Sequence, residues 1–193
     1  MKTLFLYGVF ALAPIAGTLV LSAPAYSQQM LTKAALQWPS ITSDTGEGDF
    51  DARVAAVQYL LRARGYYKGK VDGLYGPRTV AAVKAFQRKS ELKPDGVAGP
   101  KTLPKLVLPV KRGSKGDAVR AAQILARQAT NHIGGTPNGG LVVDGNYGSV
   151  TVKAIKEAQA CENDMEERLM VDGIMGPRSW CMMLGGTVAG SQL

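Results

Sequence analysis

The feature that most constrains this chain is an eight-residue pattern that occurs four times, beginning at Asp72, Asp95, Asp144 and Asp172. Each copy opens with Asp-Gly, which favours a tight turn because glycine adopts positive φ without strain. A second glycine follows, and in three copies the next residue is proline, which suits the first position of a helix because no N–H is needed there. The pattern therefore predicts four turns, each of which leads directly into a helix.

The first and third turns are each preceded by a segment with helical spacing of apolar residues. Val54, Val57 and Leu61 recur at this spacing before the first turn, and Val119 and Ala122 begin a matching series before the third. An internal duplication explains both series. We predict an all-α fold of two tandem three-helix domains with short helices, at residues 49–110 and 111–186, preceded by a linker at 26–48 and followed by a C-terminal tail at 187–193.

The N-terminus has the organisation of a signal peptide. Lys2 is followed by an apolar run at 4–20 and by a small-residue cleavage pattern at 23–25 or 25–27, which together predict a signal peptide at residues 1–25. We therefore expect the mature protein in the periplasm, in the cell wall or outside the cell. An uncleaved membrane anchor is the alternative, and it would be the only expected membrane contact. No cysteine lies near the junction, which excludes a lipid anchor of the bacterial lipoprotein kind.

The charge of the chain is uneven. The 193 residues carry a net charge of +8, and residues 49–110 hold 12 basic and 5 acidic side chains, against 9 and 8 from residue 111 to the end. A basic surface favours anionic partners. Nucleic acid is not expected among them, because export determines which partners the protein meets.

The first turn of each predicted helix contains a cation in three cases, at Arg78, Lys101 and Arg178. The helix dipole opposes a cation at this position, so a local compensation is expected. One interpretation is an ion pair with the aspartate of the preceding turn, and the other is a carboxylate ligand. Calcium binding by the turns is not expected, because each aspartate stands alone and a calcium loop needs several oxygen ligands.

Aromatic and amide side chains surround the first turn. Tyr66, Tyr67 and Tyr75 lie near several cations, a mixture that suits a polymer of sugars and peptides, although at least one tyrosine is expected in the core. Four glutamines recur beside the apolar stripes, and a buried amide must be hydrogen-bonded. We expect them to bridge helices to turn backbones, with ligand contact as the alternative; they are Gln58, Gln87, Gln123 and Gln159.

The remaining reactive side chains indicate no catalytic centre. His132 is the single histidine, and it has no evident partner for metal binding or for nucleophilic catalysis. We predict no cofactor and no metal. Cys161 and Cys181 are the two cysteines, and in an exported chain we predict a disulfide between them, with an intermolecular bridge or free thiols as alternatives.

These motifs resemble the type-1 peptidoglycan-binding domain, a three-helix module of bacterial cell-wall enzymes, and the resemblance extends over both halves. The second half departs from the pattern, with Ala158 where the first has Phe86 and Trp180 where the first has Leu103. The first half is therefore the expected binder. Its motifs are Val57-Gln58, Gly65-Tyr66-Tyr67, Val71-Asp72-Gly73, Tyr75-Gly76-Pro77-Arg78-Thr79, Phe86-Gln87 and Asp95-Gly96-Val97.

The resemblance implies a non-catalytic protein that binds peptidoglycan. Alternatives are a partner that brings a separate cell-wall hydrolase to the wall, a lytic enzyme with an unrecognised active site, or a domain reused for protein contacts. The residues expected to bind the ligand are Gln58, Tyr66, Tyr67, Asp72, Tyr75 and Arg78.

Overall fold

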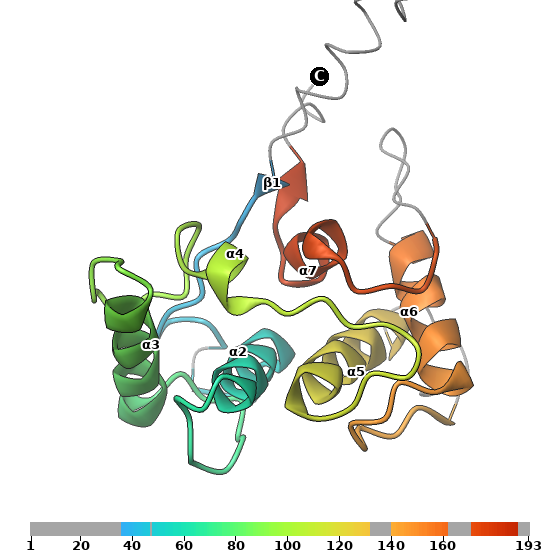
Figure 1. The fold of residues 1–193 in the computed structure, drawn as a ribbon, viewed down its shortest axis with the longest axis horizontal. Helices are drawn as coiled ribbons and strands as arrows, with labels where there is room; N and C mark the ends of the chain where they lie inside the picture. Colours follow the sequence, from blue (N-terminus) through green and yellow to red (C-terminus); the bar gives the residue numbers. More distant parts are fainter. Residues whose placement is uncertain (1–35, 47, 132–139, 162–170, 189–193) are drawn as a thin grey trace, which may run out of the picture. The chain divides into compact units, whose positions relative to one another are not determined.

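The computed structural model describes residues 36–46, 48–131, 140–161 and 171–188. The predicted signal peptide, His132 and the acidic run at 162–167 lie outside these residues. The described residues are mostly helical, which confirms the predicted all-α class, and each half contributes three helices (Figure 1). The elements are β1 (Leu36–Gln37), α2 (Ala52–Ala63), α3 (Pro77–Lys89), α4 (Leu103–Leu106), α5 (Asp117–Asn131), α6 (Ser149–Cys161), α7 (Pro177–Met183) and β2 (Thr187–Val188).

The helices begin largely where the sequence predicts. Asp51 caps α2 by accepting hydrogen bonds from the backbone N–H groups of Arg53 and Val54. Gly76 and Gly176 precede α3 and α7, each with proline at the first helical position. The second turn differs, because Pro100 lies in a turn and α4 starts only at Leu103.

The buried amide of Gln58 holds the first Asp-Gly turn in place. Its Nε2 lies 2.8 Å from Asp72 Oδ1, 2.9 Å from the Leu74 carbonyl oxygen and 3.0 Å from Thr79 Oγ1. Its Oε1 accepts from the backbone N–H groups of Asp72 and Gly73. Gln58 is completely buried, so this network satisfies an amide that would otherwise be costly to bury. We call this arrangement the glutamine lock.

The lock occurs four times, which confirms that the glutamines bridge helices to turn backbones. In each, Nε2 approaches the turn aspartate, a turn carbonyl and the hydroxyl of a residue in or next to the following helix, while Oε1 accepts from the turn glycine. The other three locks join Gln87 to Asp95, Gly96 and Thr102, Gln123 to Asp144, Gly145 and Thr151, and Gln159 to Asp172, Gly173 and Ser179.

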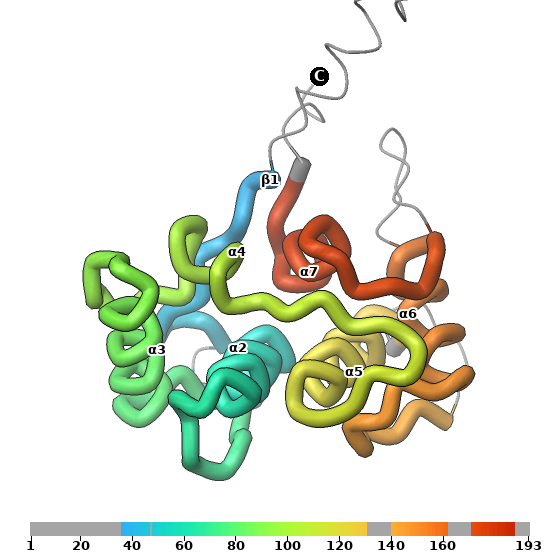
Figure 2. The backbone as a smooth tube through the Cα atoms, viewed as in Figure 1, coloured from blue at the N-terminus to red at the C-terminus, as the bar shows by residue number. Residues whose placement is uncertain are grey.

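The two halves pack through their first helices. α2 and α5 lie side by side at the centre, with α3 against α2 and α6 against α5 (Figure 2). Alanines allow this close approach, since Ala55, Ala56, Ala121 and Ala122 are all fully buried. The described residues form one compact unit, and a single core cluster includes side chains of both halves.

Polar contacts reinforce the junction between the halves. The Arg62 guanidinium on α2 donates two hydrogen bonds of 2.8 Å to the Asp117 carboxylate at the start of α5. The segment between α4 and α5 also contacts the second half. Trp180 Nε1 donates a hydrogen bond to the Leu108 carbonyl oxygen, and Val110 pairs with Met175 in an antiparallel bridge. Leu108 and Val110 belong to the predicted first domain, yet they pack against the second half.

The segments predicted as linker and tail also contribute to the fold. Ile41 is 1% exposed and pairs with Ala98 in an antiparallel bridge. β1 and β2 pair antiparallel, which joins residues 36–37 to residues 187–188. These short pairings were not predicted, because no long alternating pattern marks them.

The predicted disulfide between Cys161 and Cys181 is not formed. Cys161 is exposed at the end of α6, whereas Cys181 is buried in α7. The Cys181 Sγ faces β1, 3.5 Å from the Gln37 carbonyl oxygen, and burial raises the pKa of this thiol to about 11. The buried thiol therefore serves as a packing group.

Removal of the Gln58 amide should lower the stability of the fold substantially. Gln58→Ala leaves the N–H groups of Asp72 and Gly73 without their acceptor, so the free energy of unfolding in urea should fall by about 3 kcal/mol. Lys89→Ala, at an exposed position of α3, is the control and should change it by less than about 0.5 kcal/mol. Equal stability of the two variants would contradict the role assigned to the lock.

The ion pair between Arg62 and Asp117 should make the stability of the fold depend on pH in the acid range. The hydrogen bonds from Arg62 lower the pKa of Asp117 in the folded state, so its stabilising contribution is complete above the unfolded pKa, about 3.9, and is lost as the pH falls through the folded value. Asp117→Asn should therefore have a lower free energy of unfolding in urea at pH 7 than the original protein. Between pH 5 and pH 3 this free energy should fall less in the variant than in the original protein. Asp49→Asn, which alters an exposed acid, should retain the full acid dependence.

Candidate ligand-binding site

A pocket lies between the loop after α2 and one face of α3. Its volume is about 500 Å³, within the range of small-ligand sites. On α3, the lining positions 78, 81, 82 and 85 follow helical spacing and therefore share one face. The full lining is Tyr66, Tyr67, Lys68, Gly69, Arg78, Ala81, Ala82 and Ala85.

The loop that forms the wall is fixed by local contacts. Gly65 ends α2 with φ of 81°, a conformation that favours glycine. The Tyr67 hydroxyl donates to the Lys70 carbonyl oxygen at 2.9 Å, and Gly69 passes so close to the Tyr67 ring that a Cβ there would lie 3.0 Å from it. The Tyr66 ring packs edge to face on Phe86, with ring centroids 5.5 Å apart. These contacts place both tyrosines before any ligand arrives.

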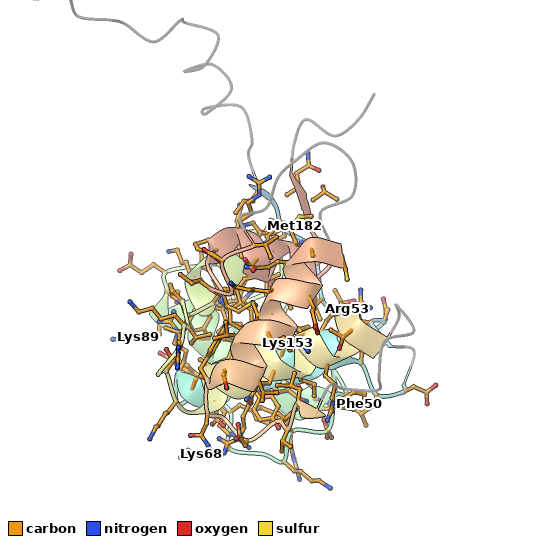
Figure 3. All side chains as sticks on the ribbon, turned by 90° about the vertical axis from the view of Figure 1, so that its right-hand side faces the viewer. Phe50, Arg53, Lys68, Lys89, Lys153 and Met182 are labelled. Atoms are coloured by element: carbon orange, nitrogen blue, oxygen red, sulfur yellow. The ribbon has the colours of Figure 1, made fainter. Side chains whose placement is uncertain are left out.

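The charged groups of the pocket are both cationic. Lys68 on the loop and Arg78 on α3 are exposed, and Lys68 points away from the fold at its surface (Figure 3). No carboxylate is among the lining residues. Among the described residues, Arg78 forms no ion pair within 4.0 Å, so the ion pair with Asp72, one of the two interpretations of this cation, is not formed.

Asp72 belongs to the lock beside the pocket. Burial opposes ionisation of its carboxyl, but hydrogen bonds from Gln58 and from the Leu74 backbone, with the nearby charge of Arg78, hold its pKa below the usual value. The carboxylate therefore stays ionised at neutral pH and stabilises the turn that leads into α3.

The six residues predicted to bind a ligand have three different placements. Tyr66, Tyr67 and Arg78 line the pocket, whereas Gln58 and Asp72 form the lock. Tyr75 is 6% exposed, and its hydroxyl donates to the Gly96 carbonyl oxygen and accepts from the Ala98 N–H. Tyr75 thus connects the first turn to the second, which confirms that at least one tyrosine lies in the core.

The sequence prediction missed the alanine floor of the pocket. Ala81, Ala82 and Ala85 contribute little chemistry of their own, and their effect is to leave space above α3. The available signal was three small residues that share a helical face with Arg78. The closeness of Gly69 to this face depends on the path of the loop, which no local pattern specifies.

On α6, the second half does not repeat the α3 side of this lining. The locks align Gln87 with Gln159 and Thr79 with Thr151, so Val150, Lys153 and Glu157 occupy the positions of Arg78, Ala81 and Ala85. Lys153, labelled on α6 in Figure 3, pairs with Glu157 at 3.8 Å. Two long side chains thus stand where the first half has an alanine floor. The glutamine lock that precedes the helix is the same in both halves.

Residues 50–106 match the family described as a putative peptidoglycan binding domain. This matched segment contains the whole pocket and the first two locks. The match covers a single copy, in the first half, where the sequence alone suggested two. No solved structure shows a significant match to the chain.

Several bacterial proteins are similar to parts of the chain. A probable N-acetylmuramoyl-L-alanine amidase of Bacillus licheniformis is 33% identical over 161 residues, covering 72% of this chain and 44% of the amidase. A spore cortex-lytic enzyme of Bacillus cereus is 45% identical over 58 residues, 30% of this chain and 22% of the enzyme. A putative OxPP cycle protein OpcA of Nostoc punctiforme is 41% identical over 60 residues, 31% of this chain and 13% of that protein.

The chain thus spans less than half the length of these relatives. Within the residues that the structure describes, no helix is long and apolar enough to cross a membrane. The same residues contain no group of three or more His, Cys, Asp or Glu side chains arranged to hold a metal ion. The pocket on α3 lies inside the segment that matches the family, and it is the candidate site.

From its buried position, we expect Tyr75 to stabilise the fold rather than to contact the ligand. Tyr75→Phe removes the hydroxyl that bonds Gly96 and Ala98 and should lower the free energy of unfolding by about 1 to 2 kcal/mol. The pocket should remain, so ligand retention by the folded protein should be unchanged. Loss of retention without loss of stability would instead assign Tyr75 to the binding surface.

Proposed function

We propose that this protein binds peptidoglycan non-covalently through the pocket on α3. The observation that carries the proposal is the coincidence of this pocket with the segment that matches the peptidoglycan binding family. Its rigid tyrosine wall, alanine floor and two cations form a preorganised surface for an uncharged or anionic wall component. The ligand-binding residues are Tyr66, Tyr67, Lys68 and Arg78. Gln58 and Tyr75 support them from the core, and Asp72 supports them from the first turn.

We further propose that the second half is a diverged copy of the same domain that has become a structural partner. Its two glutamine locks repeat those of the first half. Lys153 and Glu157 stand on α6 at the positions that correspond to Ala81 and Ala85 of the pocket floor. Its contribution is then to bury one side of α2 rather than to hold a second ligand.

We propose export through the N-terminal signal segment and a place in the cell wall. The wall-lytic names of two relatives favour a role beside a cell-wall hydrolase, as part of the same or a separate chain. A lytic activity of the protein itself is the alternative to this non-catalytic role. Zymography on gels that contain peptidoglycan separates the two, because clearing would establish an enzyme.

The binding proposal predicts that closing the pocket abolishes retention on the wall. Ala81→Lys with Ala85→Glu introduces the pair found at Lys153 and Glu157, and both residues favour helices, so the fold should persist. Retention on purified sacculi in a co-sedimentation assay at 0.15 M salt should fall by about tenfold or more.

The matched control is Lys153→Ala with Glu157→Ala, which removes the same pair from the second half. This variant should bind sacculi like the original protein. If the control loses retention and the pocket variant keeps it, the binding surface lies on the second half and the assignment is wrong.

A further inference from the structure

We propose that the pocket recognises a carboxylate at the end of a peptide stem of the wall, and that the sugars contribute little. This inference rests on the proposed function and names the part of the polymer that the pocket takes. Three properties of the lining support it: the type of its charged groups, the position of its rings and the size of its floor residues.

The ionic groups of the pocket only donate hydrogen bonds. Lysine and arginine have no acceptor, and Lys68 and Arg78 are the charged residues of the lining. The Tyr67 hydroxyl is directed to the Lys70 carbonyl oxygen. A sugar hydroxyl both donates and accepts, whereas a carboxylate only accepts, so the carboxylate matches these two cations better.

The aromatic rings form a wall rather than a platform. Tyr67 is 4% exposed, and Tyr66 is partly buried in an edge-to-face contact with Phe86. A sugar that stacks on an aromatic side chain needs an open ring face. The buried state of these rings therefore disfavours stacking of a pyranose.

The floor suits a small apolar group next to the carboxylate. Ala81, Ala82 and Ala85 present only methyl groups, which offer contact to a short side chain such as that of alanine. Residues 49–110 hold 12 basic and 5 acidic side chains, and this positive net charge adds long-range attraction for anions. A peptide stem that ends in a small residue with a free carboxylate combines all of these features.

The test compares intact sacculi with sacculi whose carboxyl groups have been converted to neutral amides, both stripped of phosphate polymers. The full protein should be retained on intact sacculi, and amidation should reduce retention by about tenfold or more. A soluble peptide that ends in D-Ala-D-Ala should compete, while its C-terminal amide and N-acetylglucosamine oligomers should not. Equal retention on amidated sacculi, or competition by the oligomers, would overturn the inference while leaving wall binding intact.

Two further arms separate the other outcomes. Absence of retention on intact sacculi would reject the proposed function itself. Competition by inorganic phosphate without competition by the peptide would assign the pocket to a phosphate polymer and overturn the inference. If amidation abolishes retention but the peptide does not compete, the ligand is a muramyl carboxylate. That result would also contradict recognition of a peptide stem.

Charge-matched variants connect the effect to the pocket. Arg78→Gln should weaken retention on intact sacculi by about tenfold and have little effect on amidated sacculi. Lys89→Gln removes the same charge from an exposed position at the end of α3, outside the pocket lining, and should change retention by less than about twofold. Equal losses in the two variants would show a general charge effect and overturn the assignment.

Discussion

The fold depends on the burial of a primary amide. Gln58 is fully enclosed, and it is stable there only because the Asp72–Gly73 turn presents both acceptors and donors to it. The same turn ends at the helix that begins with Pro77, so one network fixes the end of the loop and the start of α3. The orientation of α3, and with it the face that forms the pocket, follows from this contact.

Four repeats of this network give the two halves a common frame with different surfaces. The buried partners of the locks tolerate little change, because each change would leave a donor or acceptor unsatisfied. Outward positions are not restricted in this way, and they differ most clearly at Ala81 and Ala85 against Lys153 and Glu157. Packing of α2 against α5 then joins the two frames into one unit, so the second half packs against the half that contains the pocket.

Much of this frame could be predicted from the sequence, because the constraints are local. Asp-Gly turns, helix starts and glutamines beside apolar stripes are all recognisable within a few residues. The pocket could not be predicted in detail, since it depends on the loop at 65–69 crossing α3. Tyr75 illustrates the limit: its position in the sequence suggested a surface role, but its hydroxyl reaches Gly96 across the core. The cysteines illustrate it again, because their separation in space depends on the packing of α6 and α7.

Binding through the pocket on α3 is tested most directly by a map of backbone amide shifts in ¹⁵N-labelled protein titrated with a soluble peptidoglycan fragment that carries its peptide stem. A single pocket on α3 predicts one set of saturable shifts, at Lys68, Gly69 and the first two turns of α3 around Arg78 and Ala81, with the amides of Val150 and Lys153 unchanged. Shifts centred on α6, or on the α2–α5 junction without α3, would contradict a single pocket in the first half.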